Sequence, residues 1–214
     1  MGGYYNAVVT RAITVIGAVI ATSMATASAA AAQASSGGDS TTSSQPHYIR
    51  SLALGAISSI LLHEAGHIST AIALGHRPTF GFDKLRPTVY SGINSHSKPH
   101  EQFLFSAAGL TVQSVIDEAI LDVPHARGSA FERGMIGGGI GTTLFYLTIG
   151  RTGSVSDVDF MARTRAMTKT QITLLFGSIA AVHTWRVSRD PHYANFFVRP
   201  APGGGAAVGV EWRR

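Results

Sequence analysis

The residues best suited to chemistry lie in the segment His63-Glu64-Ala65-Gly66-His67. On a helix, His63 and His67 share one face, one turn apart, so both imidazoles can bind a single zinc ion. Glu64 projects about 100° round the helix, where its carboxylate can take a proton from metal-bound water and later donate it to a leaving amine. Gly66 would leave room for a substrate backbone. The pattern predicts hydrolysis that depends on Zn²⁺, with Glu64 as the general base.

A catalytic zinc usually has three protein ligands and one open position, so the motif requires a further ligand from elsewhere. The chain has no cysteine, and therefore an Asp, Glu or His must supply it. The candidate carboxylates lie in a later apolar stretch and in the polar loop near residue 157: Asp117, Glu118, Asp122, Asp157 and Asp159. We predict Asp157 as the third metal ligand, ahead of Asp117 and then Asp159, which stay open as alternatives. We interpret His183 as a hydrogen-bonded core residue.

The composition favours a membrane environment for these residues. Charged residues make up 14% of the chain, compared with about a quarter in typical soluble domains, and the mean hydropathy is +0.18. The net charge of +5 comes from basic residues that are mostly scattered singly. This scatter argues against nucleic-acid binding and fits loops at an anionic membrane surface. The absence of cysteine excludes disulfides and a cysteine nucleophile.

The motif lies within the apolar stretch Ser51–Gly75, which as a helix would be about 37 Å long, enough to cross a bilayer with tilt. Further apolar stretches cover 103–121, 134–150 and 170–185. The stretch 134–150 contains Gly134 and Gly138 at a spacing that lets membrane helices approach closely. The β-prone pieces within 78–93 predict a small hairpin or an edge strand. We therefore predict an all-α membrane helical bundle of three to five spans, with a small β element after the zinc-motif helix.

The remaining segments suggest a simple domain organisation. Residues 1–32 contain Arg11, a weakly apolar run and small residues of the cleavage-site kind, which fits a signal or a membrane anchor segment. Residues 33–49 are mainly polar and small, as in a flexible linker. We assign 50–187 to a membrane-embedded metalloprotease-like domain and 188–214 to a C-terminal tail. Loop 76–102 carries four Lys or Arg and 28–49 none, which predicts that these loops lie on opposite sides of the membrane.

This pattern resembles the site-2 proteases, which are intramembrane zinc metalloproteases. In that family an H-E-x-G-H-type motif lies in a transmembrane helix, and a small β element follows. A second helix then opens with Ala-Gly-Pro and an Asn three residues later, and a later Asp-Gly motif supplies the third zinc ligand. The resemblance covers about residues 50–165 and includes Ala108-Gly109-Leu110-Thr111-Val112-Gln113. It implies that Gln113, in the place of the Asn, is a catalytic amide that orients substrate or stabilises an oxyanion. Leu110 replaces the Pro, and no Asp-Gly pair follows residue 113.

We therefore expect a zinc metalloprotease of the intramembrane endopeptidase kind. Its partners would be a membrane protein or peptide substrate and the lipid bilayer, with no nucleic acid. The resemblance implies an integral membrane protein, which in a bacterium would lie in the inner (cytoplasmic) membrane. Two alternatives stay open: a non-catalytic membrane protein with a structural zinc site or a partner-binding role, and a soluble secreted zinc hydrolase released by cleavage near Ala29. The sequence does not define the oligomeric state.

Overall fold

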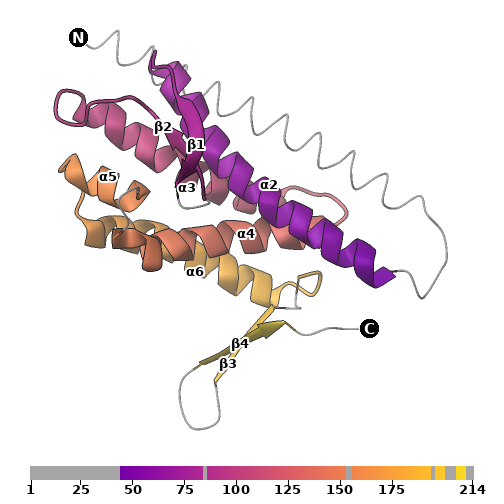
Figure 1. Ribbon diagram of the computed structural model, residues 1–214. Helices are drawn as coiled ribbons and strands as arrows, with labels where there is room; N and C mark the ends of the chain where they lie inside the picture. Colours follow the sequence, from indigo (N-terminus) through magenta and orange to yellow (C-terminus); the bar gives the residue numbers. More distant parts are fainter. Residues whose placement is uncertain (1–43, 84–85, 153–155, 194–195, 201–205, 211–214) are drawn as a thin grey trace.

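The computed structural model describes residues 44–83, 86–152, 156–193, 196–200 and 206–210, and these residues are mainly helical (Figure 1). The helices are α2 (Ser44–Ala73), α3 (Pro99–Asp122), α4 (Ala130–Leu147), the 3-10 turn η1 (Ile149–Thr152), α5 (Asp157–Arg163) and α6 (Lys169–Arg189). The antiparallel strands are β1 (Thr79–Asp83) with β2 (Arg86–Tyr90), and β3 (Phe196–Pro200) with β4 (Ala206–Val210). A mostly helical fold with a small β element after the motif helix is thus confirmed.

Several predicted boundaries differ from the structure. Helix α2 begins at Ser44, so residues 44–49, which we assigned to the linker, are helical. Pro46 lies in its first turn, where a proline removes no hydrogen bond from the helix. The short helix α5 lies in a segment predicted as a loop, and the β3–β4 hairpin lies in the predicted C-terminal tail. Residues 1–32 and most of the predicted linker lie outside the described residues.

Close contact between α2 and α4 depends on glycine. A Cβ atom on Gly134 would lie 2.0 Å from the Leu52 carbonyl oxygen, and one on Gly55 would lie 2.0 Å from the Phe131 carbonyl oxygen. Gly138 lies against Ala56 in the same way. These helices therefore pack backbone to backbone, as the spacing of the glycines in α4 predicted.

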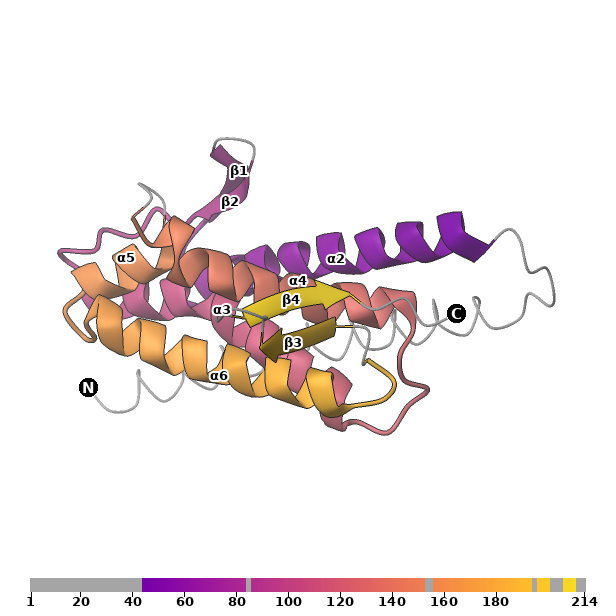
Figure 2. The same ribbon diagram turned by 90° about the horizontal axis from the view of Figure 1, so that it is seen from below.

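Helix α3 lies at the centre of the bundle and contacts α2, α4, α5 and α6. The largest buried apolar cluster joins four of these helices through Leu110, Leu147, Val158, Met161, Ile172 and Phe176. Val158 and Met161 of α5 belong to the same cluster as Leu110 of α3, and the two helices are in contact. This packing holds the short helix α5, and with it Asp157, against the interior of the bundle. The far end of the β1–β2 hairpin extends beyond the helices (Figure 2), while β2 contacts α2.

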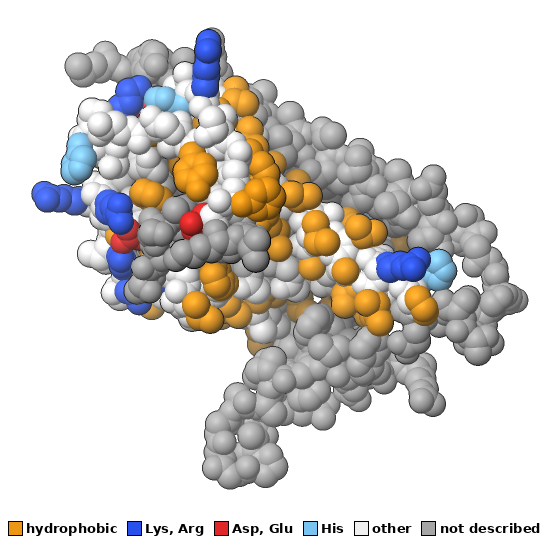
Figure 3. Space-filling view, in the orientation of Figure 1, with side chains coloured by type: hydrophobic (Ala, Val, Ile, Leu, Met, Phe, Trp, Pro, Cys, Tyr) orange, Lys and Arg blue, Asp and Glu red, His pale blue; other side chains and the backbone are white. Residues whose placement is uncertain are grey.

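The outer faces of the helices carry many exposed apolar side chains. On α2 they include Leu54, Ile57 and Leu61, each more than half exposed, and Figure 3 shows hydrophobic side chains along this helix. On α6 they include Leu174 and Trp185. By length and composition, α3 is the helix in the described part of the chain that could cross a membrane. The predicted number of three to five spans stays a prediction.

Candidate metal centre

Two helices bring the motif histidines and Asp157 to one point. The Nε2 atoms of His63 and His67 lie 3.1 Å apart, and Oδ2 of Asp157 lies 3.0 Å from the first and 3.4 Å from the second. The three residues are 1, 3 and 9% exposed. In a tetrahedral zinc site with bonds of about 2.0–2.1 Å, neighbouring ligand atoms lie about 3.3 Å apart. The group has the spacing of ligands around a single ion and could hold one.

The other nitrogen of each imidazole faces α3. Nδ1 of His67 lies 2.7 Å from the carbonyl oxygen of Phe105, and Nδ1 of His63 lies 3.0 Å from Oε1 of Gln113. Both partners are acceptors, so each Nδ1 carries the hydrogen and each Nε2 presents a lone pair. Two lone pairs and the oxygen of Asp157 thus converge in a buried space. Such an arrangement is stable only with a cation between the atoms, either a proton or a metal ion.

Asp157 is the first residue of α5. The hydroxyl of the preceding Ser156 accepts a hydrogen bond from the Asp159 amide and caps the helix. Burial raises the pKa of the Asp157 carboxyl. In the absence of a metal ion, a proton shared with the imidazoles of His67 and His63 supplies positive charge and hydrogen bonds that outweigh burial, so this pKa lies below its ordinary value. The carboxyl is therefore ionised, which is the form that binds a metal.

Glu64 lies beside the group and is held by the β1–β2 hairpin. Its Oε2 atom accepts a hydrogen bond of 3.1 Å from the backbone amide of Val89 in β2. Val89 is paired with Phe80 of β1, and its side chain packs on the bundle against Ala71 and Phe105. The predicted β element thus orients the carboxylate that we predicted as the general base.

Two glycines allow α3 to approach the motif. A Cβ atom on Gly109 would lie 2.5 Å from Nε2 of His63 and 2.6 Å from Nε2 of His67. A Cβ atom on Gly66 would lie 2.9 Å from the Ala108 carbonyl oxygen. The space beside Gly66 is therefore filled by α3, and our expectation that it admits a substrate backbone was wrong.

Sequence reasoning missed Tyr146 of α4. Its ring stacks on the imidazole of His63, with centroids 5.2 Å apart and an angle of 11° between the planes. An aromatic residue in an apolar stretch is an ordinary core residue, so nothing in the sequence around Tyr146 indicated this contact. The stacking limits the rotation of the His63 ring and supports its orientation.

The alternative ligands lie elsewhere. Asp117 of α3 faces His183 of α6. The Oδ2 atom of Asp117 lies 3.8 Å from the Nδ1 atom of His183. Asp159 forms ion pairs with Lys169, at 2.6 Å, and with Arg163. Glu118 and Asp122 both pair with Arg186. Of the five candidate carboxylates, the structure brings only Asp157 to the motif histidines.

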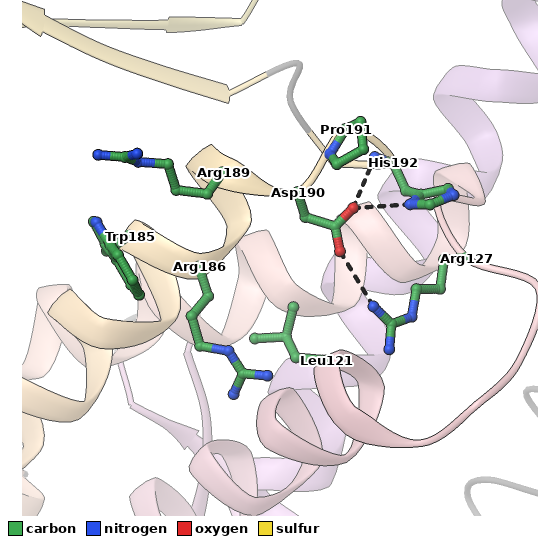
Figure 4. Close-up of a pocket in the computed structure, with 8 residues that line it drawn as sticks. All are labelled: Leu121, Arg127, Trp185, Arg186, Arg189, Asp190, Pro191 and His192. Atoms are coloured by element: carbon green, nitrogen blue, oxygen red, sulfur yellow. Dashed lines mark hydrogen bonds and ion pairs between the residues drawn. The ribbon is translucent and has the colours of Figure 1, made fainter.

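A separate cavity of about 430 Å³ lies at the C-terminal end of α6 (Figure 4). Its charged groups are largely paired with one another: Asp190 contacts Arg127 at 3.3 Å and His192 at 2.9 Å. It includes Trp185 and Arg189, with the guanidinium 5.7 Å from the ring centroid. It shares no residue with the group around His63.

Comparisons with protein-family models, with curated proteins and with solved structures found no match to this chain.

Proposed function

We propose that this chain is a zinc-dependent hydrolase that cleaves a peptide bond within or near a membrane. The proposal depends above all on one observation: three buried ligand atoms, from His63, His67 and Asp157, converge at 3.0–3.4 Å. Two imidazoles and one carboxylate are a ligand set of known catalytic zinc sites, whereas structural zinc sites usually have four protein ligands. The described residues provide three in this group, which leaves one position for water.

The residues around the ion would divide the chemistry between them. Zinc would lower the pKa of a bound water to about 7 and so supply hydroxide near neutral pH. Glu64, next to His63 in the chain, would accept the proton and deliver it to the leaving amine. The amide of Val89 keeps the carboxylate of Glu64 in place. A peptide fits this chemistry because its cleavage requires both a nucleophilic water and a protonated leaving group.

The membrane part of the proposal is supported by the surface of the bundle. Large apolar side chains are exposed along α2 and α6, and large exposed apolar surfaces mark sites that contact a membrane or another protein. Lys169 and Arg186 bracket the apolar part of α6, about 25 Å apart along the helix. Helix α3 is long and apolar enough to span. His63, Glu64 and His67 lower the mean hydropathy of α2, which is expected for a helix that carries a catalytic motif.

The runner-up is a non-catalytic protein with a structural metal site. The burial of all three ligands favours this alternative, because a substrate must reach the metal. Glu64→Gln separates the two functions, since it removes the base and leaves the ligands intact. We expect this variant to retain about one zinc per chain and to lose roughly 10²- to 10⁴-fold in hydrolysis rate.

The test compares wild type, Glu64→Gln, His63→Ala and a Glu118→Gln control in detergent. Zinc content is measured by elemental analysis, and cleavage is followed on a pool of fluorogenic peptides and fusions that contain transmembrane segments. Glu118 lies on α3 and bonds to His183 and Arg186, so its substitution should not affect the rate. Cleavage by Glu64→Gln at the wild-type rate would reject the general base. A wild type without zinc would reject the whole proposal, and one with zinc but no hydrolysis would favour the structural site.

A further inference from the structure

Both ends of the Gln113 amide are engaged with α2. The residue lies on α3 and is 1% exposed. Its Oε1 atom is 3.0 Å from Nδ1 of His63, and its Nε2 atom is 3.3 Å from the carbonyl oxygen and 3.2 Å from the hydroxyl of Ser59. Ser59 and His63 are four residues apart and share one face of α2. The amide therefore spans one turn of α2 and ends at Nδ1 of His63, the ring nitrogen that faces away from Asp157.

The contacts determine which atom of the amide faces which partner. A backbone carbonyl can only accept, so the side of Gln113 that faces Ser59 must be the NH₂ group. The oxygen Oε1 then faces His63, and because this oxygen can only accept, Nδ1 of His63 must donate. The Nε2 atom of that ring is left with its lone pair toward His67 and Asp157. A single amide thus sets both the tautomer and the direction of the ring.

We propose that Gln113 is a positioning residue for His63, which holds the ring in the form that binds metal. This inference rests on the metal centre of the proposed function. It replaces the substrate-contacting role that the family resemblance implied. An amide that stabilises an oxyanion must aim a free N–H at the reacting carbonyl, whereas the NH₂ group of Gln113 is already bonded twice to Ser59.

His67 provides an internal comparison. Its Nδ1 atom donates to the Phe105 carbonyl oxygen of α3, so α3 orients both motif histidines. The Phe105 contact comes from the backbone and cannot be removed by a side-chain substitution. The Gln113 contact comes from a side chain, and its removal isolates the effect of orientation on one ligand. Loss of such an outer contact typically weakens metal binding by about 10- to 100-fold.

The experiment uses the full chain in detergent and three variants. Gln113→Met keeps the length of the side chain but lacks a strong acceptor, and Gln113→Glu keeps the acceptor. Gln102→Leu is the matched control, because Gln102 is also a buried amide of α3 but bonds to Ser106. The zinc Kd is measured by chelator competition. The protonation of each imidazole nitrogen is measured by ¹⁵N NMR of metal-free protein labelled at histidine.

We expect the His63 ring to be protonated at Nδ1 in the wild type and to lose this preference in Gln113→Met. The zinc Kd should rise about 10- to 100-fold in Gln113→Met. It should rise less in Gln113→Glu, which keeps the acceptor for Nδ1 of His63 but loses the donor to Ser59, and change little in Gln102→Leu. A wild-type His63 without a proton on Nδ1 would overturn the inference without recourse to any variant. Unchanged zinc affinity in Gln113→Met with a reduced kcat would overturn it in favour of a substrate contact. The NMR measurement uses metal-free protein and does not depend on zinc binding or hydrolysis. Failure of this inference can therefore be distinguished from failure of the proposed function.

Discussion

Replacing Gly109 with alanine would place a methyl group against both motif imidazoles. The added Cβ atom would lie 2.5 Å from Cε1 and Nε2 of His63 and 2.6 Å from Nε2 of His67. Carbon atoms pack best at about 3.5–4.0 Å, so the rings would have to move by about 1 Å. Gln113 and Phe105 hold the other side of these rings from the same helix. The imidazoles therefore cannot move away without lengthening those hydrogen bonds.

The expected magnitude follows from the cost of overpacking, which is about 1–3 kcal/mol. Without metal, the imidazoles of His63 and His67 can relieve the contact with the new methyl group by giving up their hydrogen bonds to Gln113 and Phe105. With metal bound, both Nε2 atoms must converge, so the cost falls on metal binding. At about 1.4 kcal/mol per tenfold change, the zinc Kd should rise by about 5- to 140-fold in Gly109→Ala.

The assay is chelator competition for zinc in detergent, together with the thermal unfolding of each variant. Gly141→Ala is the control, because a Cβ atom on this glycine of α4 would meet no atom within 4 Å. It should bind zinc like the wild type. A folded Gly109→Ala protein with the wild-type zinc Kd would refute the reasoning, since the imidazoles would then not lie against Gly109 when metal is bound.

Three further predictions concern the third ligand, the topology and the packing of the helices. Asp157→Asn should lose most of the bound zinc, whereas Asp117→Asn should keep it, as measured by zinc content; the reverse result would move the site onto α3. Single cysteines at His47, in the first turn of α2, and at Ser97, after the hairpin, should react with a membrane-impermeant reagent from opposite sides; labelling from one side would mean that α2 does not span. Gly134→Ala should lower the unfolding temperature relative to the control glycine variant of α4, because its methyl group would overlap the α2 backbone; an unchanged temperature would contradict the close packing of α2 and α4.

Much of the fold was predictable because the length of each apolar stretch can be read directly from the sequence. The apolar stretches predicted α2, α3, α4 and α6 to within several residues at most ends. The short helix α5 was missed, since seven residues carry too little periodicity to be recognised. The start of α2 was predicted too late, because polar residues can extend the end of a helix that is stabilised by its apolar middle.

The sequence by itself determined that His63 and His67 lie next to each other, since any helix brings residues four apart onto one face. It also placed Glu64 beside them. Only the tertiary structure decided among the distant candidates, because Asp157 lies 94 residues from His63 in the chain. Its place depends on how α5 packs in the apolar cluster around α3. The same packing decides the partners of Gln113, because contacts between helices depend on the shapes of both surfaces and no local pattern records them.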